Sequence, residues 1–375
     1  MANERFTITY RISLYHDEDI NSKIESICRE QSVELPRSVL NPYIEQTIVG
    51  SLTRLDRNPD ASYFAQIAYP LGNVGLEIAQ FLNILFGNIS LIPGIQVKAV
   101  DWSALPSGLL PGPRFGIDGV RKLMGVEHRA LSSTALKPMG STASELAAMA
   151  YEFAAGGIDL IKDDHGLTNQ VYAPFEQRLE AVSASVNKAN AQTGNTSWYI
   201  PHITADGDEL FRRYELAREY GVGAVMICPQ LCSPGALSEL ASRENGLPIM
   251  VHPSFSGTFV LDNRHGFDKA FLYGGLWRAM GADMTIFPNH AGRFSFTLKE
   301  CLDIVHTARD TSLPYKPIFP TPGGGLQRKS IPYWIEKYGR DSIFLIGGSL
   351  YQHPEGIRAA AIEIRSLLEE AVYED

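Results

Sequence analysis

Cysteine is scarce in this sequence, with 4 residues in 375, and no apolar run reaches the roughly 18 residues needed to span a bilayer. Cys28, Cys228, Cys232 and Cys301 are too few and too scattered for a disulfide scaffold. Cys228 and Cys232 are close enough to suggest one pair of zinc ligands, but no second cysteine pair completes the site. We therefore expect a cytoplasmic protein with reduced thiols and no membrane partner.

Basic residues are also in deficit, with 33 Lys and Arg against 42 Asp and Glu and a formal net charge of −9. Affinity for nucleic-acid backbones depends on clustered Lys and Arg, so this balance argues against a nucleic-acid partner. The first residues, MANERFTITYRISLYHDED, lack a positive segment followed by an apolar one, so we expect no secretory signal. A hydrophobic content of 45% with 20% charged residues is typical of a globular protein with one large or two ordinary domains.

The N-terminal part of the chain mixes two kinds of secondary structure. The pattern is strand-like at residues 6–12 and 63–69 and helical at residues 20–30 and 74–85. A passage rich in Pro and Gly follows at residues 92–116 and contains IPG, LPSG and LLPGPRFG, so we interpret it as a linker. This predicts an N-terminal α+β domain over residues 1–112 and a second domain over residues 113–375.

Short apolar runs then recur about every 30 residues, the length of a β-α unit. The eight runs are LSSTALKP (131–138), IDLIKDD (158–164), SWYIPHIT (197–204), GAVMICP (223–229), LPIMVHP (247–253), ADMTIFP (282–288), KPIFP (316–320) and SIFLIGG (342–348). Continuously apolar strands are typical of parallel strands buried on both faces. Eight such units favour a (β/α)8 barrel over a doubly wound sheet, which would rarely give eight evenly spaced units.

The active site of such a barrel lies at the C-terminal ends of its strands. The first run ends in Lys137, and the second ends in Lys162, Asp163, Asp164 and His165. Residues i and i+2 of a strand point to the same side, so Lys162 and Asp164 should project together into the barrel mouth. A lysine beside carboxylates is an ion-pair partner, an electrophilic cation or, once modified by CO2, a carbamate that binds Mg²⁺ through oxygen. Spacing alone favours the ion pair.

Glycine clusters follow the last two runs, at Gly323, Gly324 and Gly325 and at Gly347 and Gly348. Glycine-rich loops after strands seven and eight of a barrel commonly present backbone N–H groups to a phosphate. Glycine also serves simple tight turns, but two clusters at these two strands favour a phosphate site.

Several of these motifs resemble the ribulose bisphosphate carboxylase (RuBisCO) superfamily. GGIDLIKDDHGLTNQ (156–170) is similar to the family segment with the carbamylated lysine, LSSTALKPMGST (131–142) to its catalytic Lys-Pro strand, and ITAD (203–206) to its third strand. PGGG (322–325) and LIGGSLYQHPEG (345–356) resemble its paired phosphate loops. The resemblance implies an N-terminal ferredoxin-like α+β domain followed by the (β/α)8 barrel.

The resemblance also implies roles for the site residues. It makes Lys137 the base and makes Lys162, carbamylated by CO2, a ligand of Mg²⁺ or another divalent metal together with Asp164 and His165. It assigns binding of the substrate phosphate to four glycines, Gly324, Gly325, Gly347 and Gly348. It assigns contact with a substrate hydroxyl to His252. FLNILFGNISL (81–91) and YIEQTIVGS (43–51) resemble segments that supply Asn88 and Glu45 across the interface of the family's two-fold dimers. A homodimer with sites at the subunit interface is therefore expected.

The departures from the family pattern narrow the function. His165 replaces the metal-binding Glu, which weakens Mg²⁺ binding or makes His165 an acid/base or hydrogen-bond donor instead. Met139 replaces the second lysine of the family's Lys-Pro-Lys. Arg293 replaces the loop-six lysine that holds CO2, and its planar guanidinium is not equivalent to an ammonium.

The second phosphate pocket of the family loses its charged donors at Pro253, Ile286 and Gly323, and a dianion needs such donors. A monophosphate with a neutral or apolar distal end is the expected substrate. We therefore expect a RuBisCO-like protein that removes a proton α to a ketone, giving a metal-stabilised enediolate without CO2 fixation.

Isomerisation of 5-methylthioribulose 1-phosphate is the leading prediction, because one mobile lysine can both remove and return a proton. The alternatives are decarboxylation of an oxo-acid sugar phosphate of the 3-oxo-isoapionate 4-phosphate type, with Arg293 on the carboxylate, and the 2,3-diketo-5-methylthiopentyl-1-phosphate enolase reaction of methionine salvage. The altered metal triad also allows a catalytically retired regulatory binding protein.

Overall fold

The structure, a computed structural model, describes residues 4–233 and 235–371. The chain divides into two compact units. Unit 1 comprises Met1–Leu110, Ser256–Leu272 and Ser312–Pro314, and unit 2 comprises Pro111–Phe255, Tyr273–Thr311 and Tyr315–Asp375. Within the described ranges, none of the helices has the length and apolar character that crossing a membrane requires.

Unit 1 is built on a five-stranded sheet in the order β10-β4-β1-β3-β2. Its strands are β1 (Arg5–Ile12), β2 (Ser51–Arg57), β3 (Tyr63–Pro70), β4 (Ile95–Val100) and β10 (Gly266–Phe267), and its helices are α1 (Ile20–Glu30), α2 (Pro42–Thr47), α3 (Ile78–Phe86) and α9 (Gly257–Val260). Strand β1 pairs antiparallel with β3 and β4, and β2 pairs antiparallel with β3. The order β1-α1-β2-β3-α3-β4 is that of a ferredoxin-like domain, which confirms the predicted class.

Local sequence explains why these elements form. Every second residue of β1 is buried, as expected of a strand with one face on the core. Helix α1 begins after Asp19, whose side chain accepts a hydrogen bond from the Ser22 N–H. The linker prediction for residues 92–116 is wrong in part, because β4 lies inside that passage. Its Pro and Gly residues flank a strand with a buried start at Ile95 and Val97 rather than replacing it.

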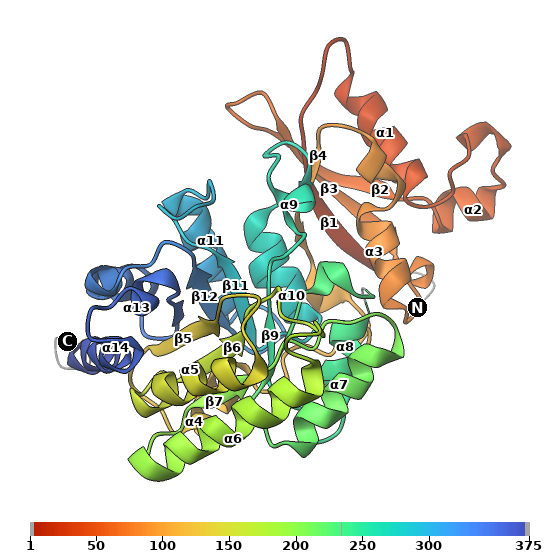
Figure 1. The fold of residues 1–375 in the computed structure, drawn as a ribbon. Coiled ribbons are helices and arrows are strands. Elements are labelled where there is room, and N and C mark those ends of the chain that lie inside the picture. Colours follow the sequence, from red (N-terminus) through yellow and green to blue (C-terminus); the bar gives the residue numbers. More distant parts are fainter. Residues whose placement is uncertain (1–3, 234, 372–375) are drawn as a thin grey trace. The chain divides into compact units, whose positions relative to one another are not determined.

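Unit 2 is an eight-stranded parallel sheet in the order β7-β6-β5-β13-β12-β11-β9-β8. Seven of the eight predicted apolar runs contain one strand each, and the run at 316–320 contains only the start of its strand. The strands are β5 (Leu131–Leu136), β6 (Leu160–Asp163), β7 (Trp198–Ile200), β8 (Val225–Ile227), β9 (Ile249–Val251), β11 (Met284–Pro288), β12 (Phe319–Gly323) and β13 (Ile343–Leu345). The two end strands meet just beyond β7, where the Met226 N–H donates to the Pro201 carbonyl and the Ile203 N–H donates to the Met226 carbonyl. The sheet is thus a nearly closed barrel, which confirms the (β/α)8 prediction (Figure 1).

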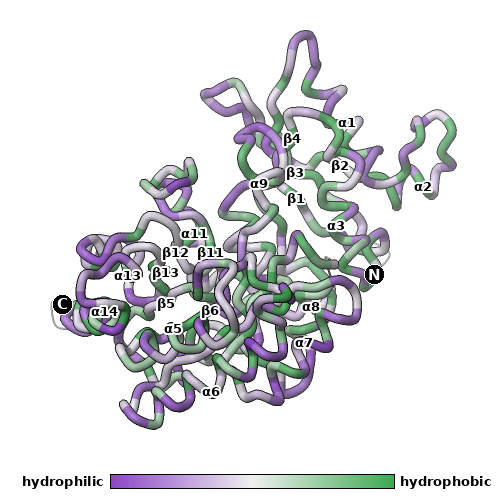
Figure 2. The backbone as a smooth tube through the Cα atoms, viewed as in Figure 1, coloured by the Kyte–Doolittle hydropathy of each residue, from purple (hydrophilic) through white to green (hydrophobic). Residues whose placement is uncertain are grey.

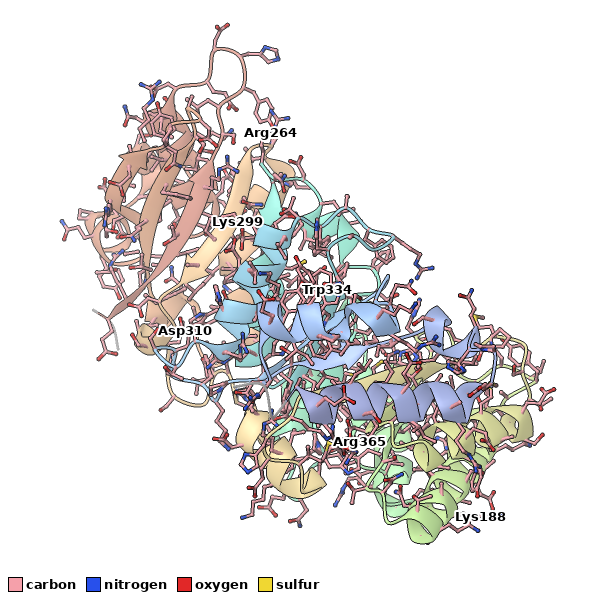
Figure 3. The ribbon with its side chains drawn as sticks, turned by 90° about the vertical axis from the view of Figure 1, so that its left-hand side faces the viewer. Lys188, Arg264, Lys299, Asp310, Trp334 and Arg365 are labelled. Atoms are coloured by element: carbon pink, nitrogen blue, oxygen red, sulfur yellow. The ribbon has the colours of Figure 1, made fainter. Side chains whose placement is uncertain are left out.

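Helices cover the outside of the barrel. They are α4 (Gly116–Met124), α5 (Ala143–Ala155), α6 (Phe175–Thr193), α7 (Asp208–Glu219), α8 (Ala236–Ser242), α10 (Trp277–Ala279), α11 (Leu298–Arg309), α12 (Ile331–Tyr338), α13 (Gly348–Tyr351) and α14 (Ile357–Glu370). Helices α5 and α6 lie side by side in Figure 1, and Figure 3 shows α12 with Trp334 next to α14 with Arg365. Hydrophilic and hydrophobic residues alternate along outer helices such as α6, as expected of helices with one face on the barrel (Figure 2).

The floor of the barrel is apolar, and each strand contributes one side chain to it. These residues are Leu131, Leu160, Ile200, Met226, Met250, Met284, Phe319 and Ile343, and Ile117, Val120 and Met124 of α4 pack against them. Burial of such side chains stabilises the fold by about 1.5–3 kcal/mol each. Because side chains alternate along a strand, the residue two positions beyond each floor residue also points into the barrel, and there the functional layer begins.

Candidate active site

Polar and ionisable side chains stand directly above the apolar floor. Lys162 lies two positions after the floor residue Leu160, and His202 lies two positions after Ile200. In the same way, Cys228 lies two positions after Met226 and His252 two positions after Met250. Lys162, His202 and Cys228 are almost fully buried. Four neighbouring strands thus direct an amine, two imidazoles and a thiol toward the mouth of one barrel.

Lys162 is a buried amine with a strongly perturbed pKa. Its Nζ donates a 3.0 Å hydrogen bond to the Asp163 carbonyl. The pKa of Lys162 is lowered to about 8, chiefly by burial; the negative charge of Asp164 opposes this shift and the positive charge of Lys137 adds to it. A substantial fraction of this amine is therefore unprotonated just above neutral pH, and the unprotonated amine is the form that reacts with CO2.

Asp164 pairs with the other lysine of the site. Lys137 Nζ lies 2.7 Å from Asp164 Oδ1, and the Lys137 side chain is 41% exposed while that of Asp164 is 12% exposed. Burial alone would raise the pKa of Asp164, but contacts with His165 and Lys137 and the charge of Lys162 hold it far below its usual range. Spacing predicted an ion pair between Lys162 and Asp164. In the structure the lysine paired with Asp164 is Lys137, and Lys162 donates to the Asp163 carbonyl instead.

Tyr351 orients the backbone that carries Lys137. The Lys137 N–H donates to Tyr351 Oη at 3.0 Å, and Tyr351 Oη donates to the Ala135 carbonyl at 2.8 Å. Burial raises the pKa of Tyr351 well above its usual range, so the hydroxyl stays protonated. Helix α13, beyond the eighth strand, thus braces the end of the first. Sequence reasoning gave Tyr351 no role, although it lies in the LIGGSLYQHPEG motif.

His165 and His252 form a stacked pair beside Asp164. Their ring centroids are 4.4 Å apart with an interplanar angle of 15°, and His165 Nδ1 lies 3.6 Å from Asp164 Oδ1. Burial and the charge of Lys162 hold the pKa of His252 well below its usual range. The Ser254 N–H donates to His252 Nδ1 at 3.1 Å, so a neutral His252 carries its proton on Nε2. His252 is thus a hydrogen-bond donor through Nε2.

The donor set around Lys162 suits a divalent cation only after the lysine is modified. Among residues 4–233 and 235–371, no three His, Cys, Asp or Glu side chains are grouped to hold a metal. Carbamylation of Lys162 would supply the missing donor, giving two oxygen donors and one imidazole nitrogen with Asp164 and His165. The buried amine of Lys162 and the ionised carboxylate of Asp164 fit this arrangement, and oxygen donors are those Mg²⁺ prefers.

The two glycine turns lie next to each other. Strands β12 and β13 are neighbours, and Ser349 Oγ donates to the Leu326 carbonyl at 3.2 Å, which joins the turns that follow them. A Cβ at Gly324, Gly347 or Gly348 would meet no atom within 4 Å, so the space beside these backbones is open. Gly324 has a φ of +89°, a backbone conformation that favours glycine. The turns are therefore accessible to a phosphate.

Loop six packs against these turns. A Cβ at Gly325 would lie 2.6 Å from the Gly292 Cα, so only glycine allows this approach. Arg293 is exposed, and its guanidinium lies 5.4 Å from the Phe294 ring centroid. Ile286, where the sequence predicts the loss of a phosphate donor, belongs to the apolar barrel core.

The remaining predicted residues lie in unit 1. Asn88 is exposed where the turn Asn88–Leu91 begins. Glu45 is partly buried on α2 and forms a 3.5 Å ion pair with Arg37. Their roles stay predictions.

Comparison with known proteins places this barrel in a family. Residues 116–294 match the family described as ribulose bisphosphate carboxylase large chain, catalytic domain. The solved Rubisco-like protein from Rhodopseudomonas palustris superposes with a TM-score of 0.88 at 32% identity, covering 100% of this chain and 99% of that one. Fold and site thus define a (β/α)8 enzyme of the RuBisCO superfamily.

Sequence relatives narrow the assignment. Ribulose bisphosphate carboxylase-like protein 1 of Rhodopseudomonas palustris is 34% identical over 93% of both chains. The chain therefore belongs to the RuBisCO-like proteins, the non-carboxylating enzymes of this superfamily. A relative named 5-methylthioribulose-1-phosphate isomerase, from Rhodospirillum rubrum, is 33% identical over 93% of this chain and 92% of its own. One named 2,3-diketo-5-methylthiopentyl-1-phosphate enolase, from Geobacillus thermodenitrificans, is 30% identical over 96% and 91%.

Solved relatives also include assemblies. The dimeric archaeal Rubisco from Hyperthermus butylicus superposes with a TM-score of 0.85 at 28% identity, covering 98% of this chain and 90% of that one.

Proposed function

We propose that this chain isomerises 5-methylthioribulose 1-phosphate by removing and returning a proton next to the ketone. The observation that carries the proposal is the pairing of Lys137 with Asp164 beside the buried amine of Lys162. This arrangement offers one partly exposed amine at the barrel mouth, with the carboxylate of Asp164 next to it and the candidate carbamate Lys162 nearby. The 33% identity with the isomerase of Rhodospirillum rubrum supports the choice of substrate.

Each residue has a defined task in this proposal. The backbone N–H groups of Gly324, Gly325, Gly347 and Gly348 bind the phosphate and fix the position of the carbon chain. Lys137 takes the proton from the carbon next to the ketone and returns it to the former carbonyl carbon. The hydroxyl proton of the first carbon passes to the former carbonyl oxygen, so the ketone moves one carbon along the chain and no atom is gained or lost.

The remaining side chains hold charge in place. His252 donates a hydrogen bond from Nε2 to a substrate hydroxyl. A divalent cation, Mg²⁺ by preference, bound to carbamylated Lys162, Asp164 and His165, would polarise the ketone and so lower the cost of removing the proton. Pro253, Ile286 and Gly323 supply no charged donor for the distal end of the substrate, which suits a methylthio group better than a second phosphate.

The direct test is product formation followed by NMR. Purified protein with Mg²⁺ and bicarbonate should convert 5-methylthioribulose 1-phosphate and leave ribulose 1,5-bisphosphate unchanged. Lys137→Ala should lose about 10²–10⁴-fold in rate, the usual contribution of a general base. Conversion of neither substrate, or equal conversion by the Lys137→Ala variant, would contradict the proposal.

A second candidate shares the first step. The enolase of Geobacillus thermodenitrificans is 30% identical, so a 2,3-diketo-5-methylthiopentyl 1-phosphate substrate is the alternative that the relatives favour. In that reaction the proton returns to oxygen rather than carbon. Including this compound in the NMR assay separates the two candidates by which one is consumed.

We further propose a homodimer in which Asn88 and Glu45 of the partner subunit complete each site. The dimeric archaeal Rubisco supports this proposal. Mixing unfolded Lys137→Ala and Asn88→Ala chains and refolding them together tests it. If sites are shared, half of the dimers are mixed and each regains one intact site, so about a quarter of wild-type activity returns. Sites contained within one chain would give no recovery.

A further inference from the structure

We propose that His202 is a positioning residue that holds the turn carrying Asp164 and His165 from both of its ends. His202 is 1% exposed, and its side chain points into the barrel beside Lys162. The inference rests on the proposed function, which needs Asp164 and His165 in fixed positions.

Two hydrogen bonds from His202 bracket the turn. Its backbone N–H donates to Asp163 Oδ2 at 3.0 Å, and its ring Nδ1 lies 3.1 Å from the Leu167 carbonyl. The Leu167 N–H donates to the Asp164 carbonyl at 2.9 Å and closes the turn. His202, which follows strand β7, therefore holds Asp163 before the turn and Leu167 after it.

The ring of His202 has one protonation pattern that satisfies its contacts. A carbonyl only accepts hydrogen bonds, so Nδ1 carries the hydrogen toward Leu167. In the neutral ring Nε2 is then an acceptor, and Thr204 Oγ1 donates to it at 2.7 Å. Thr204 Oγ1 in turn accepts from the Cys228 N–H at 2.9 Å. The hydrogen bonds therefore run in one direction, from β8 through Thr204 and His202 to the turn.

This network leaves the imidazole no free position for acid/base work. Burial also lowers the pKa of His202 to about 3, so the ring stays neutral under assay conditions. His202 therefore acts through the residues it holds. Arg178 supports the same turn from outside the barrel, because it contacts both Asp163 and the Thr168 carbonyl.

Side-chain geometry gives a matched set of variants. In His202→Asn, the amide nitrogen takes the place of Nδ1 and keeps the bond to Leu167. In His202→Gln, the amide nitrogen lies farther out, near the Nε2 position, and the Leu167 bond is lost. His202→Leu keeps apolar volume and removes both ring bonds, to Leu167 and to Thr204, while the backbone bond to Asp163 remains in all three variants. The Asn variant should therefore rescue function, and the Gln and Leu variants should not.

The experiment measures Mn²⁺ binding by electron paramagnetic resonance in the presence of bicarbonate, without substrate. We expect His202→Asn to bind within about threefold of the wild type and His202→Leu to bind 10–100-fold more weakly, the usual effect of losing a residue that orients a metal ligand. In the isomerase assay, His202→Leu should lower kcat by a similar factor and leave KM within about twofold, because the phosphate turns belong to β12 and β13. Equal Mn²⁺ affinity in the Asn and Leu variants would overturn the inference.

Two features keep the test decisive. Mn²⁺ binding needs no substrate, so it still reports on His202 if the sugar phosphate proves to be a different one. If the His202 variants do not fold, Thr204→Ser and Thr204→Val replace them, since only the serine keeps the hydroxyl that orients His202. Weaker Mn²⁺ binding in Thr204→Val than in Thr204→Ser supports the inference, and equal binding overturns it.

Discussion

Replacing Lys162 by methionine should stabilise the protein at neutral pH while removing the candidate carbamate. Lys162 is buried, and burial lowers its pKa from 10.5 to about 8. A methionine side chain fills a similar apolar volume and carries no charge to desolvate. We therefore expect the variant to have a higher free energy of unfolding and to lack the group that would bind the metal. Such a trade-off between stability and function is common at active-site residues.

The magnitude follows from the pKa shift and its sign. The folded pKa is depressed, so between pH 8 and pH 10.5 the unfolded chain binds more protons and stability rises with pH. Below pH 8 the full penalty applies, about 3 kcal/mol, because the pKa falls from 10.5 to about 8 and each tenfold change in the protonation equilibrium is worth about 1.36 kcal/mol. Loss of the hydrogen bond to Asp163 removes about 1 kcal/mol, which leaves a net gain of about 2 kcal/mol for the variant at pH 7.

Urea unfolding at 25 °C, in buffer free of CO2 and divalent metals, measures the effect. The advantage of Lys162→Met over the wild type should shrink by about 2 kcal/mol between pH 7 and pH 9.5, because the wild-type lysine deprotonates in that interval. The matched control is Lys122→Met on α4, where the lysine is exposed and no such change is expected. A difference between Lys162→Met and the wild type that does not vary with pH would refute the reasoning.

Three other substitutions test the supporting structure. Arg178→Met should cost about 3–5 kcal/mol in urea unfolding, because Asp163, like Arg178, is 0% exposed and would lose its ion pair; a loss below 1 kcal/mol would contradict this. Gly325→Ala should raise KM for the sugar phosphate about tenfold or more, since its Cβ would meet Gly292, whereas Gly125→Ala, with a similar φ of +68° and open space, should leave KM unchanged. Asp164→Asn should weaken Mn²⁺ binding by 10-fold or more, and unchanged binding would remove Asp164 from the metal site.

The barrel was predictable because its strands are continuous apolar runs at regular spacing. Strand β4 was not, because the Pro and Gly residues on either side of it are typical of loops. At the site, alternation along β6 placed Lys162 and Asp164 on one side. The choice of Lys137 as the partner of Asp164 depends on the register of β5 against β6, with Ala135 opposite Lys162, and no local pattern encodes that register.

The contacts of His202 were hidden for the same reason. Its partners Leu167, Thr204 and Cys228 come from three different strand ends, and a single sequence does not reveal which of them meet. The sequence places His202 and Thr204 just beyond strand β7, two positions apart, and gives none of their partners.

Proton exchange with solvent tests the central claim, removal of a proton next to the ketone by Lys137, most directly. The wild-type protein, incubated in deuterium oxide with 5-methylthioribulose 1-phosphate, Mg²⁺ and bicarbonate, should incorporate deuterium at the carbon beside the carbonyl, as followed by proton NMR. Lys137→Ala should abolish incorporation, and Lys122→Ala should not affect it. Deuterium incorporation that continues at the wild-type rate in Lys137→Ala would contradict the account.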